Sequence, residues 1–315
     1  MVPKAAVVVP HYEQHQLLKR CIAALGAQTL DVPCEIVVCD DGSRRPPELP
    51  ATTSSGIPVR FVSVTHRGPA AARNAGAAAT LAPILAFTDV DCTPHPTWLR
   101  EHVEFLSTHL RVSVTTGPVT DATRLRPWSP LHRFMHHLAD LDREPQYFEY
   151  GAVRMLGLIG ANLVVRTSMF RALDGFDMRY AQPGGEDYDF ALRCQAAGWQ
   201  AEFVRTAVVA HRYPTGSRSL IRRWVGYGAG KEEFAHKHGI DREKLQLPEA
   251  TLRGRLPSLR LIEHLARQHF DGAFHGRRFP AVTATAVETC FQYGALRQRS
   301  CRRQDTATQP ATEES

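Results

Sequence analysis

The first half of the chain alternates between short apolar runs and stretches with helical periodicity. Four runs predict strands, namely Ala5–Val9, Glu35–Cys39, Val59–Val64 and Ile84–Phe87, and the first is a continuous apolar run typical of a strand buried on both faces. Between the first two, apolar residues recur at helical spacing from Leu18 to Leu25. An alanine-rich segment, Pro69 to Thr80, begins with a proline suited to a first helical turn. Strands that alternate with helices predict an α/β fold with a mostly parallel, Rossmann-like sheet flanked by helices.

The second half of the chain has a more mixed pattern. Ile159–Arg166 predicts a further strand, and the loop Pro183-Gly184-Gly185 leads into a predicted helix. The apolar face of that helix consists of Phe190, Ala191, Cys194 and Ala197. Two short strands are expected at Ala201–Arg205 and Ala207–Ala210, and His211 closes the second. From Ser217 onward the pattern is helical, whereas roughly 304 to 315 is polar and typical of a disordered tail.

Composition places the chain among globular proteins that bury a substantial core. It has 315 residues, of which 43% are hydrophobic and 22% charged. No apolar run approaches the roughly 20 residues that span a bilayer. The run Ala5–Val9 is too short for a signal peptide and meets Pro10. The expected location is therefore the cytoplasm.

Neither the cysteines nor the net charge identifies a function. The seven cysteines form no CxxC pair, which is typical of reduced, mostly buried thiols. The net charge is +6, with one arginine cluster at Arg222-Arg223 and another from Arg297 to Arg303. These clusters are consistent with peripheral contact to an anionic membrane or a lipid-linked acceptor, or with a solvated helix face and tail. No nucleic-acid-binding motif accompanies the charge, so nucleic acid is not an expected partner.

Polar residues follow three of the predicted strands. Strand one precedes Pro10-His11-Tyr12-Glu13, strand two precedes Asp40-Asp41-Gly42-Ser43, and strand four precedes Asp89-Val90-Asp91. Ligands of parallel sheets bind beyond the carboxyl ends of the strands. These three segments are therefore expected to converge on one crevice.

The segment Asp89-Val90-Asp91 is the strongest local signal for a metal. Two carboxylates one residue apart, in a turn that leaves a strand, can face the same Mg²⁺ or Mn²⁺ ion and a substrate phosphate. Ordinary turn chemistry is the alternative, since Asp is common after strands. His211, at the end of its strand, either completes such a site or is a structural histidine.

Two other acidic pairs allow similar alternatives. Asp40-Asp41 can accept hydrogen bonds from a nucleotide base or ribose, or simply form a turn. Glu186-Asp187 opens a predicted helix, where the helix dipole keeps a carboxylate ionised as a general base requires. Acidic residues in a first turn are also ordinary caps, and Asp189 is a nearby competitor for the role of base.

Together, six segments resemble the GT-A glycosyltransferases of the large inverting family 2. They are VVVPHYEQHQLLKRCIAAL, EIVVCDDGS, GPAAARNAGAAAT, ILAFTDVDC, GANLVVRTSMFRALDGFD and GGEDYDFALRCQAAGW, in the family's order and spacing, from about residue 5 to 235. The resemblance implies a GT-A domain at 1–235, with a nucleotide-sugar half at about 1–120 and an acceptor half at about 121–235. A C-terminal helical extension would then occupy 236–303, with the tail at 304–315.

The resemblance also implies roles for individual residues. Asp187 matches the general base, and a divalent Mn²⁺ or Mg²⁺ ion is expected on Asp91, Asp89 and His211. The residues implied to bind the donor are Pro10, Tyr12, Asp40, Asp41, Arg73, Asn74, Asp89, Asp91 and Glu186. The implied partners are a nucleoside-diphosphate sugar and a glycan, lipid-linked or small-molecule acceptor.

Two departures from the family pattern qualify the resemblance. Glu13 stands where Asn is frequent in the P-x-Y-N opening, and Leu220 replaces the Gln of the Q-x-x-R-W motif found in processive synthases. The second departure favours a single-sugar transferase. Three alternatives stay open: a retaining transferase on the same fold, a nucleotidyltransferase, and a non-catalytic nucleotide-sugar-binding protein.

Overall fold

The computed structural model describes residues 2–123, 143–150, 153–181, 184–213, 217–245, 247, 290–299 and 302. The chain divides into two compact units. Unit 1 consists of Met1–Arg126, Met135–Ala181 and Glu186–Tyr213, and unit 2 of Pro127–Phe134, Gln182–Gly185 and Pro214–Ser315. Within the described residues, no helix has both the length and the apolarity needed to cross a bilayer.

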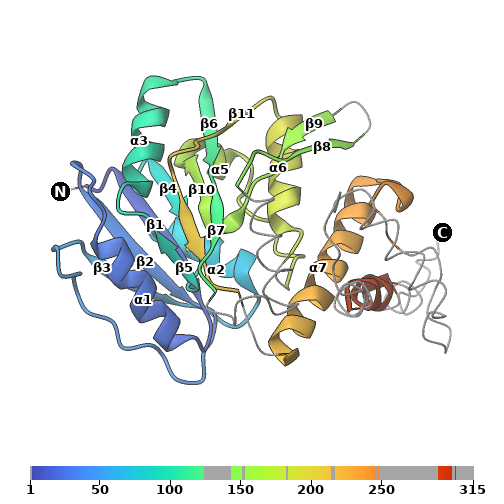
Figure 1. The fold of residues 1–315 in the computed structure, drawn as a ribbon, viewed down its shortest axis with the longest axis horizontal. Coiled ribbons are helices and arrows are strands. Elements are labelled where there is room, and N and C mark those ends of the chain that lie inside the picture. Colours follow the sequence, from blue (N-terminus) through green and yellow to red (C-terminus); the bar gives the residue numbers. More distant parts are fainter. Residues whose placement is uncertain are drawn as a thin grey trace, which may run out of the picture. The chain divides into compact units, whose positions relative to one another are not determined.

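A seven-stranded sheet forms the centre of unit 1 (Figure 1). Its order is β11 (Gln200–Phe203), β6 (Val112–Thr116), β10 (Leu163–Arg166), β4 (Ile84–Phe87), β1 (Ala5–His11), β2 (Cys34–Asp40) and β3 (Val59–Ser63). Strand β10 runs antiparallel to both neighbours, and every other adjacent pair is parallel. The predicted α/β fold with a mostly parallel sheet is confirmed.

One face of the sheet packs against two helices, α1 (His15–Gly26) and α3 (Trp98–Thr108). Alternate residues of β1, such as Val7 and Val9, join this core together with the buried side chains Leu18 and Leu25 of α1. The expected helix around Leu18–Leu25 is confirmed. Helix α3, by contrast, was not predicted.

The opposite face packs against α2 (Pro69–Ala78), α5 (Thr167–Ala172) and α6 (Glu186–Ala196). A side chain at Gly76 would place its Cβ 2.5 Å from Cγ1 of Val8, so only glycine lets α2 approach β1 this closely. Further along, Phe87 lies 5.3 Å from Phe176, and Phe176 lies 5.0 Å from Phe190, measured between ring centroids. Burial on both faces explains why central strands such as β1 and β4 are nearly continuous apolar runs, whereas the edge strand β3 is largely exposed.

Two smaller sheets and a 3₁₀ turn complete unit 1. Strands β5 (Cys92–Pro94), β12 (Val209–His211) and β7 (Val119–Asp121) form one sheet, with β12 in the centre. The second is a hairpin of β8 (Tyr147–Tyr150) and β9 (Val153–Leu156). The 3₁₀ turn η1 (Gly160–Asn162) directly precedes β10.

Several predicted boundaries are wrong, including those of the two short strands expected at Ala201–Arg205 and Ala207–Ala210, which are observed at Gln200–Phe203 and Val209–His211. The strand expected at Ile159–Arg166 begins only at Leu163, because the side chain of Asn162 is drawn into the interior and turns the chain. Ala197 follows the end of α6 and is exposed, so it does not belong to the apolar face. Helix α2 stops at Ala78, and the Thr80 hydroxyl instead donates a 2.5 Å hydrogen bond to Glu35.

The Asn162 side chain, which is fully buried, joins four segments of unit 1. Its Oδ1 accepts hydrogen bonds from Trp98 Nε1 at 2.7 Å and from His102 Nε2 at 2.9 Å. Its Nδ2 donates to the backbone carbonyls of Pro118 and Ala207. This network fixes η1, the turn on which part of the candidate site depends.

His102 makes folding stability depend on pH. Burial lowers the pKa of His102 from 6.5 to about 4, against an opposing hydrogen bond to Asn162. The unfolded chain therefore binds a proton between these values and the folded chain does not, so stability falls as pH decreases from about 6.5 towards 4. We expect a loss of about 2 kcal/mol between pH ~7 and ~5 from this residue. Urea unfolding of the wild type and of His102→Gln should show a shallower pH dependence in the variant, and equal slopes would contradict the assignment.

In unit 2, helix α7 (Ser217–His238) carries a buried acidic pair. Glu232 accepts hydrogen bonds at 2.8 Å from both Arg242 and Arg302, and at 3.3 Å from Arg299. Two arginines of the predicted basic cluster thus form internal ion pairs. The prediction that Arg299 and Arg302 belong to an exposed basic surface or tail is therefore wrong. The tail at 304–315, Arg303 and the side chain of Arg222 lie outside the described residues.

Candidate active site

The carboxyl ends of β1 and β2 lie side by side, as predicted, because His11 pairs with Asp40 in the sheet. His11 Nδ1 lies 2.6 Å from Asp40 Oδ1, and Asp40 also accepts hydrogen bonds from the hydroxyl and the backbone N–H of Ser43. Burial lowers the pKa of His11 although Asp40 opposes this shift, so the neutral ring donates its Nδ1 hydrogen to Asp40. The His11–Asp40 pair thereby fixes the loop after β2.

Asp41 fixes the approach to helix α2. Its two carboxylate oxygens accept hydrogen bonds from the backbone N–H groups of Arg67 and Gly68, at 2.8 and 2.9 Å. Gly68 has φ 94°, and an added Cβ would lie 2.2 Å from the carbonyl oxygen of Ala181. The next residue begins α2, so Asp41 positions the helix that carries Arg73 and Asn74.

The opening segment places an exposed aromatic ring at the same edge. Tyr12 stacks on His66, with ring centroids 4.3 Å apart, and His66 Nδ1 lies 2.8 Å from Asp41. Pro10 is the penultimate residue of β1. Glu13 has φ 58°, a left-handed conformation that Asn adopts more readily than Glu. Its carboxylate accepts hydrogen bonds from Arg44, and they lower the pKa of Glu13.

Arg73 links two of the predicted motifs. The guanidinium, which is 4% exposed, donates one hydrogen bond to Asp89 at 2.7 Å and one to Glu186 at 3.0 Å. Burial alone would lower the pKa of Arg73, but the two carboxylates outweigh it and raise the pKa. The neighbouring Asn74 makes two hydrogen bonds to the backbone of Phe176 and so holds the loop that leads towards α6.

The Arg73 bridge is expected to be a major source of stability. Arg73→Met leaves two carboxylates without their shared cation, and breaking a buried pair in this way costs about 3–5 kcal/mol. Arg179→Met is the control, because the Arg179–Asp177 pair is on the surface, where such pairs contribute about 0–1 kcal/mol. Chemical denaturation of both variants measures the difference. Similar losses in both would mean that the bridge does not stabilise the fold.

Asp187 lies beside this bridge at the start of α6. Burial raises its pKa well above the usual range, and the Glu186 carboxylate adds to that effect. Arg73 and the backbone N–H groups of Tyr188 and Gly160 oppose the shift. Because Arg73 already neutralises Asp89 and Glu186, it compensates Asp187 only in part. Such an elevated pKa is what a general base near neutral pH requires.

The competitor Asp189 has a different environment. It is fully buried, and its Oδ2 accepts a 2.7 Å hydrogen bond from Arg193, one helical turn further along α6. Arg193 also donates to the backbone carbonyls of Leu173 and Gly175. Asp189 therefore anchors α6 to the preceding loop.

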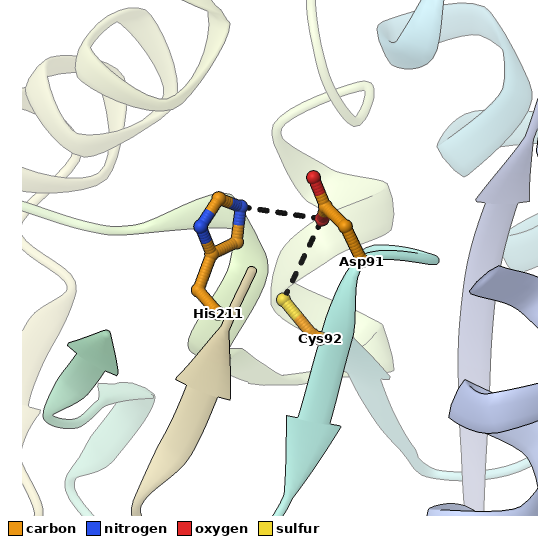
Figure 2. A group of neighbouring side chains, drawn as sticks. All are labelled: Asp91, Cys92 and His211. Atoms are coloured by element: carbon orange, nitrogen blue, oxygen red, sulfur yellow. Dashed lines mark hydrogen bonds and ion pairs between the residues drawn. The ribbon is translucent and has the colours of Figure 1, made fainter. Parts of the chain in front are cut away.

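Asp91 and His211 lie next to each other at the end of the three-stranded sheet β5–β12–β7 (Figure 2). His211 Nε2 lies 3.2 Å from Asp91 Oδ1, and the Cys92 thiol lies 3.9 Å from the same oxygen. Within the described residues these three form the one group of at least three His, Cys, Asp or Glu side chains that could hold a metal ion. Asp89, which was predicted to join them, is bound to Arg73 and lies outside this group.

The donor atoms of this group fit a divalent ion. An ion about 2.0–2.3 Å from each ligand holds its ligands roughly 3–4 Å apart. The three donor atoms here lie within 4.8 Å of one another, with a carboxylate oxygen and an imidazole nitrogen at 3.2 Å. Oxygen and nitrogen donors suit Mn²⁺ as well as other first-row ions.

Sequence reasoning missed three contributors to this arrangement. His11 was not assigned a role, and Cys92 was interpreted as one of several buried thiols. Gly160 was placed in a strand, yet its N–H donates to Asp187, and an added Cβ at Gly160 would lie only 3.2 Å from Arg73 Nη2, so glycine leaves room for the guanidinium. Because Cys92 directly follows the D-x-D segment, its position in the sequence could have indicated that its thiol lies close to Asp91.

The sequence is similar to those of known glycosyltransferases. A family model described as glycosyl transferase family 2 matches residues 6–173, and one described as the N-terminal domain of galactosyltransferase matches residues 146–215. The pre-mycofactocin glycosyltransferase of Mycobacterium tuberculosis is 29% identical over 236 residues, which cover 74% of this chain and 47% of that protein. The validoxylamine A glucosyltransferase of Streptomyces hygroscopicus is 25% identical over 221 residues, 62% of this chain and 52% of the relative. The chain thus spans about half the length of these relatives.

Solved structures show the same fold. The mannosyltransferase PcManGT of Pyrobaculum calidifontis, in complex with GDP-Man and Mn²⁺, has a TM-score of 0.55 at 18% identity, covering 95% of this chain and 88% of that one. TarS 1-349 of S. aureus, in complex with UDP, has a TM-score of 0.52 at 16% identity, covering 96% and 92%. These likenesses confirm the GT-A fold expected from the sequence.

Proposed function

The chain belongs to glycosyl transferase family 2, and from this membership we propose that it transfers a sugar from a nucleoside-diphosphate sugar to an acceptor hydroxyl with inversion of the anomeric carbon. The observation that carries the proposal is the Arg73 bridge between Asp89 and Glu186. It joins the D-x-D segment, where a donor diphosphate would lie, to helix α6, whose second residue is the candidate base Asp187. One site then contains both halves of a transfer reaction.

The donor would lie along the carboxyl ends of β1, β2 and β4. The exposed Tyr12 ring and the Asp40-Asp41 loop would hold the base and ribose, while Asp89 and Arg73 would lie at the diphosphate end. Asp40 and Asp41 are already hydrogen-bonded within the protein. Because both are also buried, their contribution to donor binding would be to fix the loop.

Asp91 and His211 would hold a divalent Mn²⁺ or Mg²⁺ ion. When bound, such an ion neutralises the charge that develops on the departing nucleoside diphosphate. The Pyrobaculum mannosyltransferase of the same fold was solved with GDP-Man and Mn²⁺, which supports both a nucleotide sugar and a divalent ion here. Asp89 is assigned to the donor side of the site because Arg73 holds it.

Asp187 would act as the general base. Its carboxylate takes the proton of the acceptor hydroxyl, whose oxygen forms the new bond to the anomeric carbon. The bond from that carbon to the diphosphate breaks on the opposite face, and the nucleoside diphosphate leaves with the bonding electrons. The acceptor would be a glycan, a lipid-linked acceptor or a small molecule.

The raised pKa of Asp187 gives a testable pH profile. A base is active only when deprotonated, so kcat/KM should fall as pH drops through the pKa of the free enzyme. An ordinary Asp would keep its activity down to about pH 4. Here the decline should begin at a clearly higher pH, because burial raises this pKa. A profile that stays flat down to about pH 4 would contradict the role of Asp187.

The product distinguishes the proposal from its rivals. Proton NMR of the first product should show an anomeric configuration opposite to that of the donor. Retention would indicate a retaining transferase on the same fold, and formation of a nucleotidyl product would indicate a nucleotidyltransferase. Binding of nucleotide sugars without turnover, tested with acceptors from all three classes, would support the non-catalytic alternative.

A further inference from the structure

We propose that Cys92 supplies a sulfur ligand to the divalent ion that Asp91 and His211 would hold, so that the site has an oxygen, a nitrogen and a sulfur donor. This inference rests on the proposed function, because it concerns the same ion. It changes the class of metal expected, since a thiolate favours borderline and soft ions such as Zn²⁺, Co²⁺ and Cd²⁺ over Mg²⁺.

Strand register brings the thiol to the site. Cys92 pairs directly with His211 in the antiparallel ladder between β5 and β12. Directly opposed residues point to the same side of a sheet, with Cβ atoms about 4.5–5.5 Å apart. The thiol and the imidazole are therefore set on one face by the backbone, and Asp91 immediately precedes Cys92 in the chain.

The donor atoms are close enough to share one ion. The thiol and the imidazole both lie next to the same carboxylate oxygen of Asp91, at 3.9 and 3.2 Å, and Figure 2 shows both side chains directed at it. These separations match the roughly 3–4 Å between ligands of one bound ion. Small side-chain adjustments would bring all three atoms into coordination distance.

A comparison with Cys21 shows that burial alone does not create this arrangement. Cys21 is as buried as Cys92, but its thiol lies 3.5 Å from the backbone carbonyl of Asp89. It belongs to no group of potential metal ligands within the described part of the chain. Cys21 is therefore a matched control: a buried thiol near the D-x-D segment that should not bind the ion.

The charge of the site follows from this ligand set. On binding a divalent ion, the Cys92 thiol would lose its proton to solvent and coordinate as thiolate. One carboxylate and one thiolate then balance the two positive charges, with His211 neutral. Asp91 and His211 alone would leave one positive charge. A sulfur ligand thus makes the ion bind more tightly in the absence of nucleotide.

Cobalt spectroscopy of the whole chain tests the proposal without relying on activity. Co²⁺ is titrated anaerobically into metal-free wild type, Cys92→Ser and Cys21→Ser, with binding followed in parallel by calorimetry. We expect a sulfur-to-cobalt charge-transfer band in the near ultraviolet for the wild type and Cys21→Ser. Cys92→Ser should lose this band, and its Cd²⁺ affinity should fall ~10-fold or more while Mg²⁺ affinity changes little.

The outcomes separate this inference from the proposed function. Stoichiometric Co²⁺ binding with ligand-field bands but without the charge-transfer band would overturn the role of Cys92 and leave the ion site intact. Absence of Co²⁺, Mn²⁺ and Mg²⁺ binding, with or without nucleoside diphosphate, would overturn the ion site itself. If Cys92→Ser fails to fold, the wild-type and Cys21→Ser spectra still decide whether a sulfur other than that of Cys21 binds the ion.

Discussion

An Asp187→Asn variant is expected to lose turnover by about 10²–10⁴-fold while it binds the donor nearly as well as the wild type. The amide has nearly the shape of the carboxylate but cannot take the proton of the acceptor hydroxyl. The substitution also removes a carboxylate that burial and Glu186 make unfavourable in its charged form, so folding should not suffer. Steady-state kinetics and a calorimetric donor titration measure the two effects separately.

Asp174→Asn is the matched control for this prediction. Asp174 is exposed and has φ 57°, a conformation that Asn accommodates, so the control should keep full activity. Activity of Asp187→Asn close to that of the control would show that Asp187 is not the base. An equal loss of donor affinity and turnover would instead assign Asp187 to donor binding.

An Asp91→Ala variant is expected to lose metal-dependent donor binding. The substitution removes the carboxylate oxygen that lies next to both His211 and Cys92. It thereby removes a proposed ligand of the ion on which donor binding would depend. We expect the affinity for nucleoside diphosphate in Mn²⁺ to fall ~100-fold, with a similar or larger loss of turnover. Calorimetry in Mn²⁺ and in EDTA measures the affinity.

The contrast with Asp89 sharpens this test. Because Arg73 holds Asp89, Asp89→Ala should reduce stability and donor affinity but leave the remaining binding dependent on Mn²⁺. Asp91→Ala should abolish that dependence. Unchanged donor affinity of Asp91→Ala in excess Mn²⁺ would contradict the assignment of Asp91 to the ion.

The sequence predicted the strands and the sheet edge well, for a physical reason. Strands such as Ala5–Val9 are buried on both faces, so they appear as continuous apolar runs that little else in a chain resembles. The carboxyl ends of parallel strands share one edge, so residues after different strands could be brought together without further information. Helix α3 was missed although Trp98, Leu99, His102 and Leu106 recur at helical spacing, because two of the four are not simple apolar residues.

What could not be predicted depends on contacts between distant residues. Nothing near Asp89 and Asp91 in the sequence indicates that one binds Arg73 and the other His211, since the turn between them separates the two side chains. The Arg73–Glu186 pair joins residues far apart along the chain. Likewise, Asn162 lies within the apolar segment from Ile159 to Val165, and only its four buried hydrogen bonds explain why η1 interrupts the expected strand.

We propose above all that this chain binds a nucleoside-diphosphate sugar through a divalent ion at Asp91 and His211. Calorimetric titration of UDP, GDP and dTDP into the purified protein, first with Mn²⁺ and then with EDTA, tests it most directly. We predict that one nucleotide binds in Mn²⁺, that EDTA abolishes its binding, and that the preferred base identifies the donor class. Failure of the folded protein to bind any of the three, or equal binding in EDTA, would contradict the account.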